Sequence, residues 1–280
     1  MGIASMDQYI ASAKQKIKLT KTASRTSVAT IPFTVFDLAG NPGAGTLAAG
    51  NTANGVLQTD AITGYASIDS FAVGATGYLT QLIYRSPVLS TMYLFDCLWK
   101  GGAYAYSAGT TTLSSQPALS GRCPDYPGSG TVFGLRNEIW VEVTTAFVTG
   151  TAWQVQVTYT NSNGTTGRTS IISAAQNAAA LTAGKMFQLA LQAGDSGVQK
   201  IDSVIVTNGG TAMTAGAFNV LIMRPLAMSR VDVAGRADRQ NLLDLGMPVV
   251  YETSALYPVI LADSTATSTP EIFIEIANAA

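Results

Sequence analysis

Residues 153–173, WQVQVTYTNSNGTTGRTSIIS, decide the fold class. Residues 153–160 and 168–173 read as two strands. The residues that connect them include Asn163-Gly164, and Asn-Gly is the strongest short-range signal for a tight turn between antiparallel strands. The stretch therefore predicts a β-hairpin.

Short strand-like segments recur on both sides of this hairpin and are separated by turns rich in Gly and Pro. They lie at residues 28–38, 78–85, 88–99, 138–147, 186–191, 201–207, 218–223, 249–252, 257–261 and 272–276. About ten short strands with such turns predict an all-β protein, a β-sandwich that we expect to be of the jelly-roll type. A second helix is predicted at 236–245, ended by Gly246, while residues 174–183 fit either a short helix or a loop.

The first 27 residues differ from the rest and predict an N-terminal helical arm with a polar linker. Ser5 is a suitable N-cap for a helix over residues 5–21, and Asp7 lies in its first turn. An apolar stripe at helical spacing is formed by Met6, Ile10, Ala13 and Ile17, and the basic residues beside it are Lys14, Lys18 and Lys21. Residues 28–280 are then the β-sandwich domain, which includes a long Gly-rich loop at 40–64.

This arm is the candidate partner-binding site. The apolar stripe could dock on another subunit while the lysines meet an acidic surface, or the helix could pack on its own domain with solvated lysines. Contact with a membrane or with nucleic acid is a third alternative, but so few basic residues do not indicate a specific nucleic-acid site. No run of apolar residues is long enough for a membrane span.

Charge is unusually scarce in this chain. Only 12% of its 280 residues are charged and none is histidine, whereas a soluble domain typically has about 25% charged residues. Histidine is the commonest general base and metal ligand, and its absence rules out Ser-His-Asp and Cys-His arrangements. The composition indicates a structural, assembling protein rather than an enzyme, and predicts neither a cofactor nor a metal site.

Two further candidates have competing interpretations. The aromatic residues Trp99, Tyr104, Tyr106, Trp140 and Trp153 could form a sugar-stacking surface, but packing in a core or an interface explains them as well. On the strand at 138–147, Glu138 and Glu142 share one face, which predicts an exposed polar row. Two cysteines, Cys97 and Cys123, are expected to be buried reduced thiols, with a single disulfide as the alternative.

The segment Leu94-Phe95-Asp96-Cys97-Leu98-Trp99-Lys100-Gly101-Gly102 resembles a motif of virion structural proteins of tailed bacteriophages. The similarity continues through Glu138–Val143, Tyr159-Thr160-Asn161, Gly167-Arg168-Thr169 and Arg224-Pro225-Leu226, and it covers roughly residues 78–230. Cys97 stands where the motif has arginine. The pattern is one of strands and turns, without a catalytic signature.

The resemblance implies a head-associated protein, such as a capsid cement or decoration protein. Its partner would be the major capsid protein, and its place the capsid surface of the virion after synthesis in the host cytoplasm. A homo-oligomer, with a trimer favoured, suits the three-fold positions of a shell. The alternatives are a glycan-binding tail or spike component and a bacterial surface adhesion domain.

Overall fold

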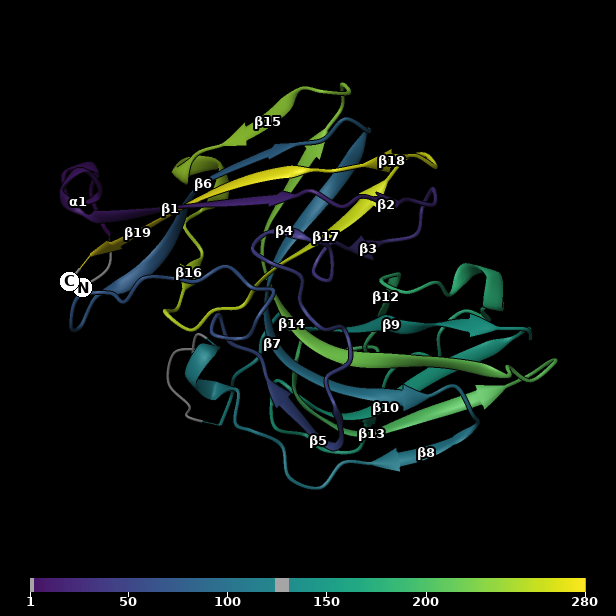
Figure 1. Ribbon diagram of the computed structural model, residues 1–280. Coiled ribbons are helices and arrows are strands. Elements are labelled where there is room, and N and C mark those ends of the chain that lie inside the picture. Colours follow the sequence, from purple (N-terminus) through teal and green to yellow (C-terminus); the bar gives the residue numbers. More distant parts are fainter. Residues whose placement is uncertain (1–2, 124–130, 280) are drawn as a thin grey trace. The chain divides into compact units, whose positions relative to one another are not determined.

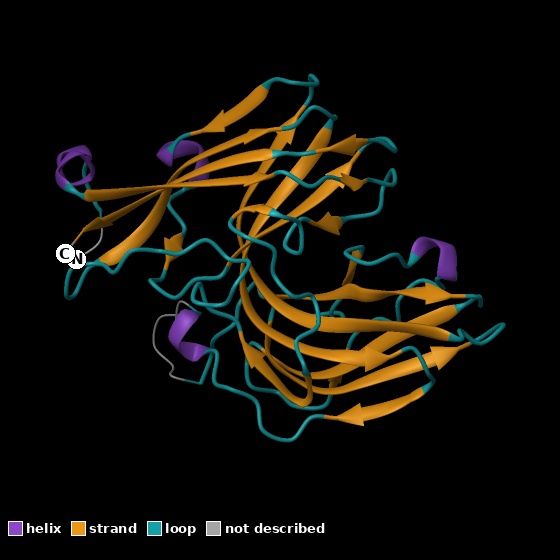
Figure 2. Cartoon of the chain, viewed as in Figure 1, coloured by secondary structure: helices purple, strands orange, loops and turns teal. Residues whose placement is uncertain are grey.

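A computed structural model describes residues 3–123 and 131–279, and most of its regular elements are antiparallel strands (Figures 1 and 2). Residues 124–130 lie outside the described residues. The chain divides into two compact units. Unit 1 comprises Met1–Thr46, Thr59–Asp96 and Leu226–Ala280, and unit 2 comprises Leu47–Gln58 and Cys97–Pro225. The predicted boundary at residue 27 does not separate these units.

Unit 1 is organised around one antiparallel sheet with the strand order β15-β6-β19-β1-β4, and β16 also pairs with β6. The bounds are β15 (Ala237–Gln240), β6 (Thr76–Arg85), β19 (Glu271–Ala279), β1 (Ala13–Lys21), β4 (Gly40–Asn41) and β16 (Val249–Val250). One face of the sheet is apolar and buried, with Ile17, Leu82, Tyr84 and Ile274 in the core of this unit.

The other strands of unit 1 complete its core. β17 (Leu256–Ala262) pairs with β3 (Phe33–Thr34) and with the first half of β7 (Ser90–Ala105), and β18 (Thr267–Ser268) pairs with β2 (Arg25–Thr26). Two short helices, α1 (Met6–Ala11) and α2 (Leu242–Leu245), belong to the same unit.

Unit 2 is a sandwich of two sheets. One has the order β11-β10-β13-β8, and the other contains β12-β9-β14-β7, with β5 paired to β7. The bounds are β5 (Asn51–Leu57), β8 (Gly109–Thr112), β9 (Glu138–Val148), β10 (Trp153–Asn161), β11 (Arg168–Thr169), β12 (Met186–Leu189), β13 (Val198–Asn208) and β14 (Ala215–Val231), with two short 3-10 helices, η1 (Ser120–Arg122) and η2 (Ala178–Ala180).

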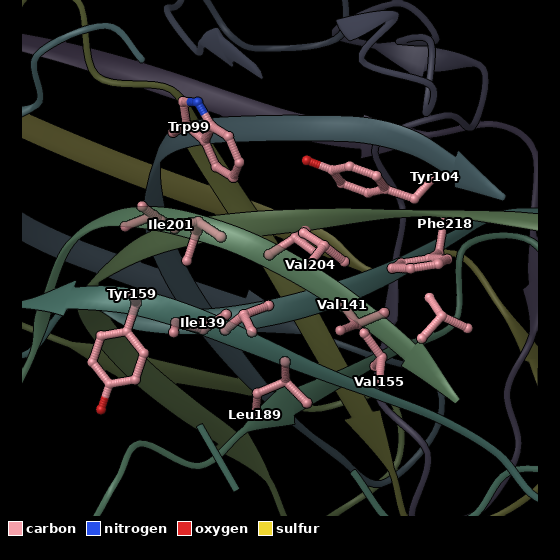
Figure 3. Close-up of a cluster of buried hydrophobic side chains, with 14 of the residues drawn as sticks. Trp99, Tyr104, Ile139, Val141, Val155, Tyr159, Leu189, Ile201, Val204 and Phe218 are labelled. Atoms are coloured by element: carbon pink, nitrogen blue, oxygen red, sulfur yellow. The ribbon is translucent and has the colours of Figure 1, made fainter. Parts of the chain in front are cut away.

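The core of unit 2 lies between these sheets, as Figure 3 shows. Val155 and Tyr159 of β10 and Val204 of β13 pack with Val141 of β9 and Phe218 of β14. Alternation along each strand sends every second side chain into this layer. The predicted all-β, sandwich-like fold class is confirmed, whereas the jelly-roll connectivity stays a prediction.

The predicted hairpin is confirmed. β10 pairs antiparallel with β11, with Tyr159 opposite Arg168. In the turn, the backbone N–H of Gly164 donates to the carbonyl of Asn161 at 2.9 Å, and Gly164 has φ +81°. That left-handed conformation explains the glycine after Asn163.

The predicted helix over residues 5–21 is wrong beyond residue 11. Residues 13–21 form β1, an internal strand that pairs with β19 and β4. The competing pattern is a strand period, in which Lys14, Lys16 and Lys18 alternate with Gln15, Ile17 and Leu19. Residues 13–21 therefore belong to the main sheet of unit 1 and not to a helical arm.

Three other predictions are corrected in part. The predicted helix at 236–245 is a strand, β15, followed by α2, which ends at Gly246 as expected. The Gly-rich stretch 40–64 contains β4 and β5 instead of being one loop. The 28–38 segment retains only β3 as a strand. Both cysteines are buried and neither forms a disulfide, which confirms the expectation of reduced thiols.

Candidate partner-binding surface

The helix α1 is short but well capped. The Ser5 hydroxyl accepts a hydrogen bond from the backbone N–H of Gln8 at 3.2 Å, and the Gln8 side chain accepts from the N–H of Ser5 at 3.1 Å. This reciprocal capping box satisfies N–H groups that a helix start leaves free. At the other end, the ammonium group of Lys14 donates to the carbonyl of Tyr9 at 2.7 Å, which suits the negative end of the helix dipole.

One side chain attaches α1 to the sheet. The Tyr9 hydroxyl donates to Glu275 Oε1 on β19 at 2.8 Å, and the Thr80 hydroxyl donates to the same oxygen at 3.0 Å. Burial, together with the neighbouring Glu275 carboxylate, raises the pKa of Tyr9 above its ordinary value. The hydrogen bond of Tyr9 therefore fixes the orientation of α1, with the side of the helix that carries Tyr9 facing Glu275 on β19.

The remaining apolar side chains of α1 are solvent-exposed. Met6 is 55% exposed and Ile10 is 68% exposed, and no residue of α1 is buried. Because the two residues are four positions apart, they share one face of the helix. Capping and the Tyr9 contact thus hold an apolar pair outward, which packing on its own domain does not explain.

Basic side chains accompany this pair on the outer face of the β1 sheet. Lys14, Lys16 and Lys18 of β1 are exposed, while the alternate residues Ile17 and Leu19 are buried on the inner face. The register places two more exposed basic residues on the outer face, Arg85 of β6 and Arg239 of β15. We call α1 and this face of β15-β6-β19-β1 the outer face.

Five basic residues outnumber the acidic residues of the outer face. Among the described residues of the outer face, three are acidic. Asp7 lies in the first turn of α1, Glu271 lies opposite Arg85 and forms an ion pair with it at 3.1 Å, and Glu275 is the buried partner of Tyr9. Lys18 lies over the Phe273 ring, 5.1 Å from its centre. The outer face therefore combines net positive charge with an exposed apolar helix.

The structure separates the predicted site residues into two groups. Met6, Ile10, Ala13, Lys14 and Lys18 are exposed, as docking on another subunit requires. Ile17 lies in the core of unit 1, and Lys21 is buried with its ammonium donating to the carbonyl of Pro42 at 2.8 Å, so those two predictions are wrong. Burial lowers the pKa of Lys21, although Asp37 opposes this.

The sequence reasoning missed Arg85 and Arg239 as members of this surface. Strand β6 was expected from the sequence, but its neighbours in the sheet were not, and Arg239 fell in a predicted helix. The alternation of lysines along 14–18 was the one signal that pointed to a sheet face instead of a helix.

The aromatic residues do not form a sugar-stacking surface. Trp99, Tyr104, Trp140 and Trp153 are all buried, and Tyr106 is partly buried against the core of unit 2. Trp153 packs edge-on against Phe147 and Phe218, with ring centres 4.9 and 5.0 Å apart. The interpretation as core packing is confirmed.

The predicted exposed row on β9 is also wrong. Glu142 is fully buried and pairs with Lys100, Nζ to Oε2, at 3.0 Å. Glu138 is partly buried and accepts a hydrogen bond from the Trp140 indole at 2.8 Å. Burial raises the pKa of Glu138, against the opposing effect of that hydrogen bond. Both faces of β9 are covered by other parts of the chain. The alternation of polar and apolar residues along β9 therefore did not predict which side chains are exposed to solvent.

A second charged cluster supports the hairpin of unit 2. Asp195 accepts hydrogen bonds from Tyr159 at 2.5 Å, from Asn161 at 2.8 Å and from Arg168 at 2.9 Å. Burial opposes ionisation of Asp195, but these three donors outweigh it and lower the pKa of the carboxyl group. Burial and the same carboxylate raise the pKa of Tyr159 to about 12. The cluster ties β10 and β11 to the loop before β13.

No protein-family model matches the chain, and no curated protein matches it. Among solved structures, the chain is similar to infectious bursal disease virus VP2 in a subviral particle, with 14% identity over 99% of this chain and 83% of that one, at a TM-score of 0.19. It is also similar to a structure of the Gx strain of that virus, with 14% identity over 95% of this chain and 80% of that one, at a TM-score of 0.20. TM-scores this low support no argument about function.

No helix among residues 3–123 and 131–279 is long and apolar enough to cross a membrane. Within the same described ranges, no three Cys, Asp or Glu side chains are grouped as a metal site would require.

Proposed function

We propose that this chain is a structural virion protein of a tailed bacteriophage, a cement or decoration protein that stabilises the head by bridging subunits of the major capsid protein. The proposal gives it a binding role and no enzymatic one, and places it on the capsid surface. It builds on the resemblance of residues 78–230 to such proteins and on the scarcity of charge.

The observation that carries the proposal is the outer face. Met6 and Ile10 are held outward by a capped helix beside the exposed Lys14, Lys16 and Lys18. An apolar anchor surrounded by charged residues is the usual composition of a protein interface. The complementary partner is an acidic patch with an apolar recess on a capsid subunit.

Many identical weak contacts account for the stabilising effect. Each copy on a shell engages subunits that the lattice already holds in place, so a second contact forms at high effective concentration. We expect the free protein to be a homotrimer, because a trimer matches the local three-fold symmetry of a shell. Light scattering on the purified chain tests this part, and a monomer would contradict it.

The decisive experiment is co-sedimentation with empty shells of the major capsid protein. We expect the wild-type chain to sediment with shells, and the double variant Met6→Ser/Ile10→Ser to lose most of the binding. The matched control is Leu243→Ser, because Leu243 is 80% exposed on the other short helix of the same unit. Equal binding by all three proteins would overturn the proposal.

Deletion is a less specific test than these substitutions. Removing residues 1–24 would remove β1, which pairs with β19 along its length from Ala13 to Thr20. Such a truncation destroys the sheet of unit 1, so lost binding would not identify the contact. Removing residues 1–11 leaves β1 intact and is the appropriate truncation.

A further inference from the structure

Three polar side chains meet inside unit 2, on neighbouring strands. Lys100 lies on β7, Asn219 on β14 and Glu142 on β9, and β14 lies between the other two strands in the sheet. Glu142 Oε2 accepts from Lys100 Nζ at 3.0 Å and from Asn219 Nδ2 at 2.8 Å. An amine and a carboxamide thus contact the same carboxylate oxygen.

The three groups are removed from water. Lys100 is 1% exposed, and Glu142 and Asn219 are fully buried. Their sequence neighbours Trp99, Val141 and Phe218 point into the core on the other face of the sheet. On their own face, Met186 lies opposite Glu142 in the register and is fully buried, as is Leu221, two residues after Asn219.

Gly102 makes room for the carboxamide. Gly102 lies on β7 two residues after Lys100, so the two share a face of that strand. A Cβ atom at Gly102 would lie 2.1 Å from Asn219 Oδ1 and 3.0 Å from Asn219 Cα. Any side chain there would displace the Asn219 carboxamide from its contact with Glu142.

The carboxamide is only half satisfied. Asn219 Nδ2 donates to Glu142 and to the carbonyl of Leu47 at 2.5 Å, but the buried Oδ1 has no hydrogen-bond partner. A buried carbonyl oxygen without a partner is unfavourable in a folded core. An ion pair alone therefore does not account for the arrangement.

We propose that Lys100 and Asn219 join in an intramolecular isopeptide bond, with Glu142 as the catalytic residue that carries the protons. Within the buried ion pair, the Lys100 ammonium first passes a proton to the Glu142 carboxylate, which leaves both groups uncharged. The uncharged amine is the nucleophile that attacks a carbonyl carbon.

The bond changes balance without any co-reactant. Lys100 Nζ forms a bond to Asn219 Cγ, and the electron pair of the carbonyl moves to Oδ1. Glu142 then gives its proton to Nδ2, the Cγ–Nδ2 bond breaks as the carbonyl re-forms, and ammonia leaves. The surplus proton on Nζ passes to Glu142, so the acid is restored and the net change is loss of one ammonia. The contacts of Glu142 Oε2 with both nitrogens supply both proton transfers.

The first test is the intact mass of the denatured wild-type chain. The proposal predicts a mass about 17 Da below the value calculated from the sequence, because one ammonia is lost. Protease digestion followed by tandem mass spectrometry should yield a branched peptide that joins the segments containing Lys100 and Asn219. A chain of full calculated mass without this peptide would overturn the proposal, whatever the variants do.

Three variants identify the reacting groups. Lys100→Ala, Asn219→Ala and Glu142→Gln should each show the full calculated mass, and the matched control Lys200→Ala, which alters the exposed pair with Asp202, should keep the deficit. The masses are measured on denatured chains, so a variant that folds poorly can still be measured. The branched peptide from the wild-type chain identifies the bond independently of how the variants fold.

The same mass loss has one other source in this chain. Cyclisation of an Asn-Gly step also releases ammonia, and Asn54-Gly55, Asn163-Gly164 and Asn208-Gly209 are such steps. A deficit that persists in Asn219→Ala would assign the loss to one of them and overturn the proposal. This test is independent of shell binding, so it can fail while the cement role stands.

Discussion

Lysine occupies two opposite environments in this protein. On β1, Lys14, Lys16 and Lys18 point to solvent from the outer face of unit 1. On β7, Lys100 is buried in unit 2 and touches Glu142. Solvated lysines cost the fold little and are available to a partner, whereas a buried lysine must be paired within the fold.

The two units place their few charges differently. Unit 2 holds charged residues inside, in the Lys100–Glu142 pair and in the Asp195 cluster, while unit 1 presents five basic residues on one surface. The exposed set is suited to recognition and the buried set to internal cross-linking of strands.

The largest expected effect comes from removing the buried lysine. Lys100→Ala prevents the cross-link between residues 100 and 219, and closing a loop of about 100 residues stabilises by about 4.7 kcal/mol. In a chain that has not formed the bond, the same substitution instead removes the cation of the buried Lys100–Glu142 pair, which lowers the free energy of unfolding by about 3–5 kcal/mol. Lys16→Ala should change stability by less than about 0.5 kcal/mol. Guanidinium unfolding of the two variants measures the contrast, and similar values would contradict it.

The Asp195 cluster should give the next largest effect. Asp195→Ala removes the acceptor of Tyr159, Asn161 and Arg168, and hydrogen bonds to a buried charge are worth about 1.5–3 kcal/mol each before compensation. We expect a loss of about 3 kcal/mol in guanidinium unfolding. Lys200→Ala, which breaks an exposed pair, is the control and should cost about 0.5 kcal/mol or less. A loss below 1 kcal/mol for Asp195→Ala would show that the cluster is not a structural tie.

The same cluster predicts an acid dependence. The pKa of Asp195 is lower in the folded chain than its ordinary value of 3.8. Its contribution is therefore complete above that ordinary value and is lost as the pH falls toward the lower folded pKa. Calorimetric melting points at falling pH should decline more steeply below pH 4 for the wild-type chain than for Asp195→Asn, which cannot ionise. Parallel curves would contradict this account.

Charge reversal on the outer face should affect binding more than stability. Among the described residues neither the Lys16 nor the Arg239 side chain forms a hydrogen bond or ion pair, and Lys16 lies opposite Glu275 in the register. Lys16→Glu/Arg239→Glu should therefore unfold within about 1 kcal/mol of the wild type, because the new carboxylate at position 16 faces a like charge. Binding to shells should weaken about tenfold, and added salt should narrow the difference, because screening reduces attraction between exposed charges. An unchanged affinity would exclude this face from the interface.

The sequence predicted individual strands and turns better than it predicted which strands pair with one another in the sheets. The hairpin at 153–173 was predictable because its turn is encoded by adjacent residues, and most strands were located within a few positions. Residues 13–21 satisfied both a helical and a strand period, and the choice was made by pairing with β19, which lies more than 250 residues away.

The candidate site was predicted only in part for the same reason. Met6, Ile10, Lys14 and Lys18 were recognised from local spacing, whereas Arg239 joins them only through sheet register. The buried trio was not predictable, because Lys100, Glu142 and Asn219 are separated along the chain. The alternation of residues along β9 identified which face of the strand carries Glu142. It could not show that this face is buried in the folded chain.

The most direct test of the outer face is an amine-labelling footprint of the protein, free and bound to shells, read lysine by lysine with mass spectrometry. We predict that Lys14, Lys16 and Lys18 are labelled in the free chain and protected on shells, while the exposed Lys200 is labelled in both states. Equal labelling of the three β1 lysines with and without shells would contradict the assignment of this face to the capsid.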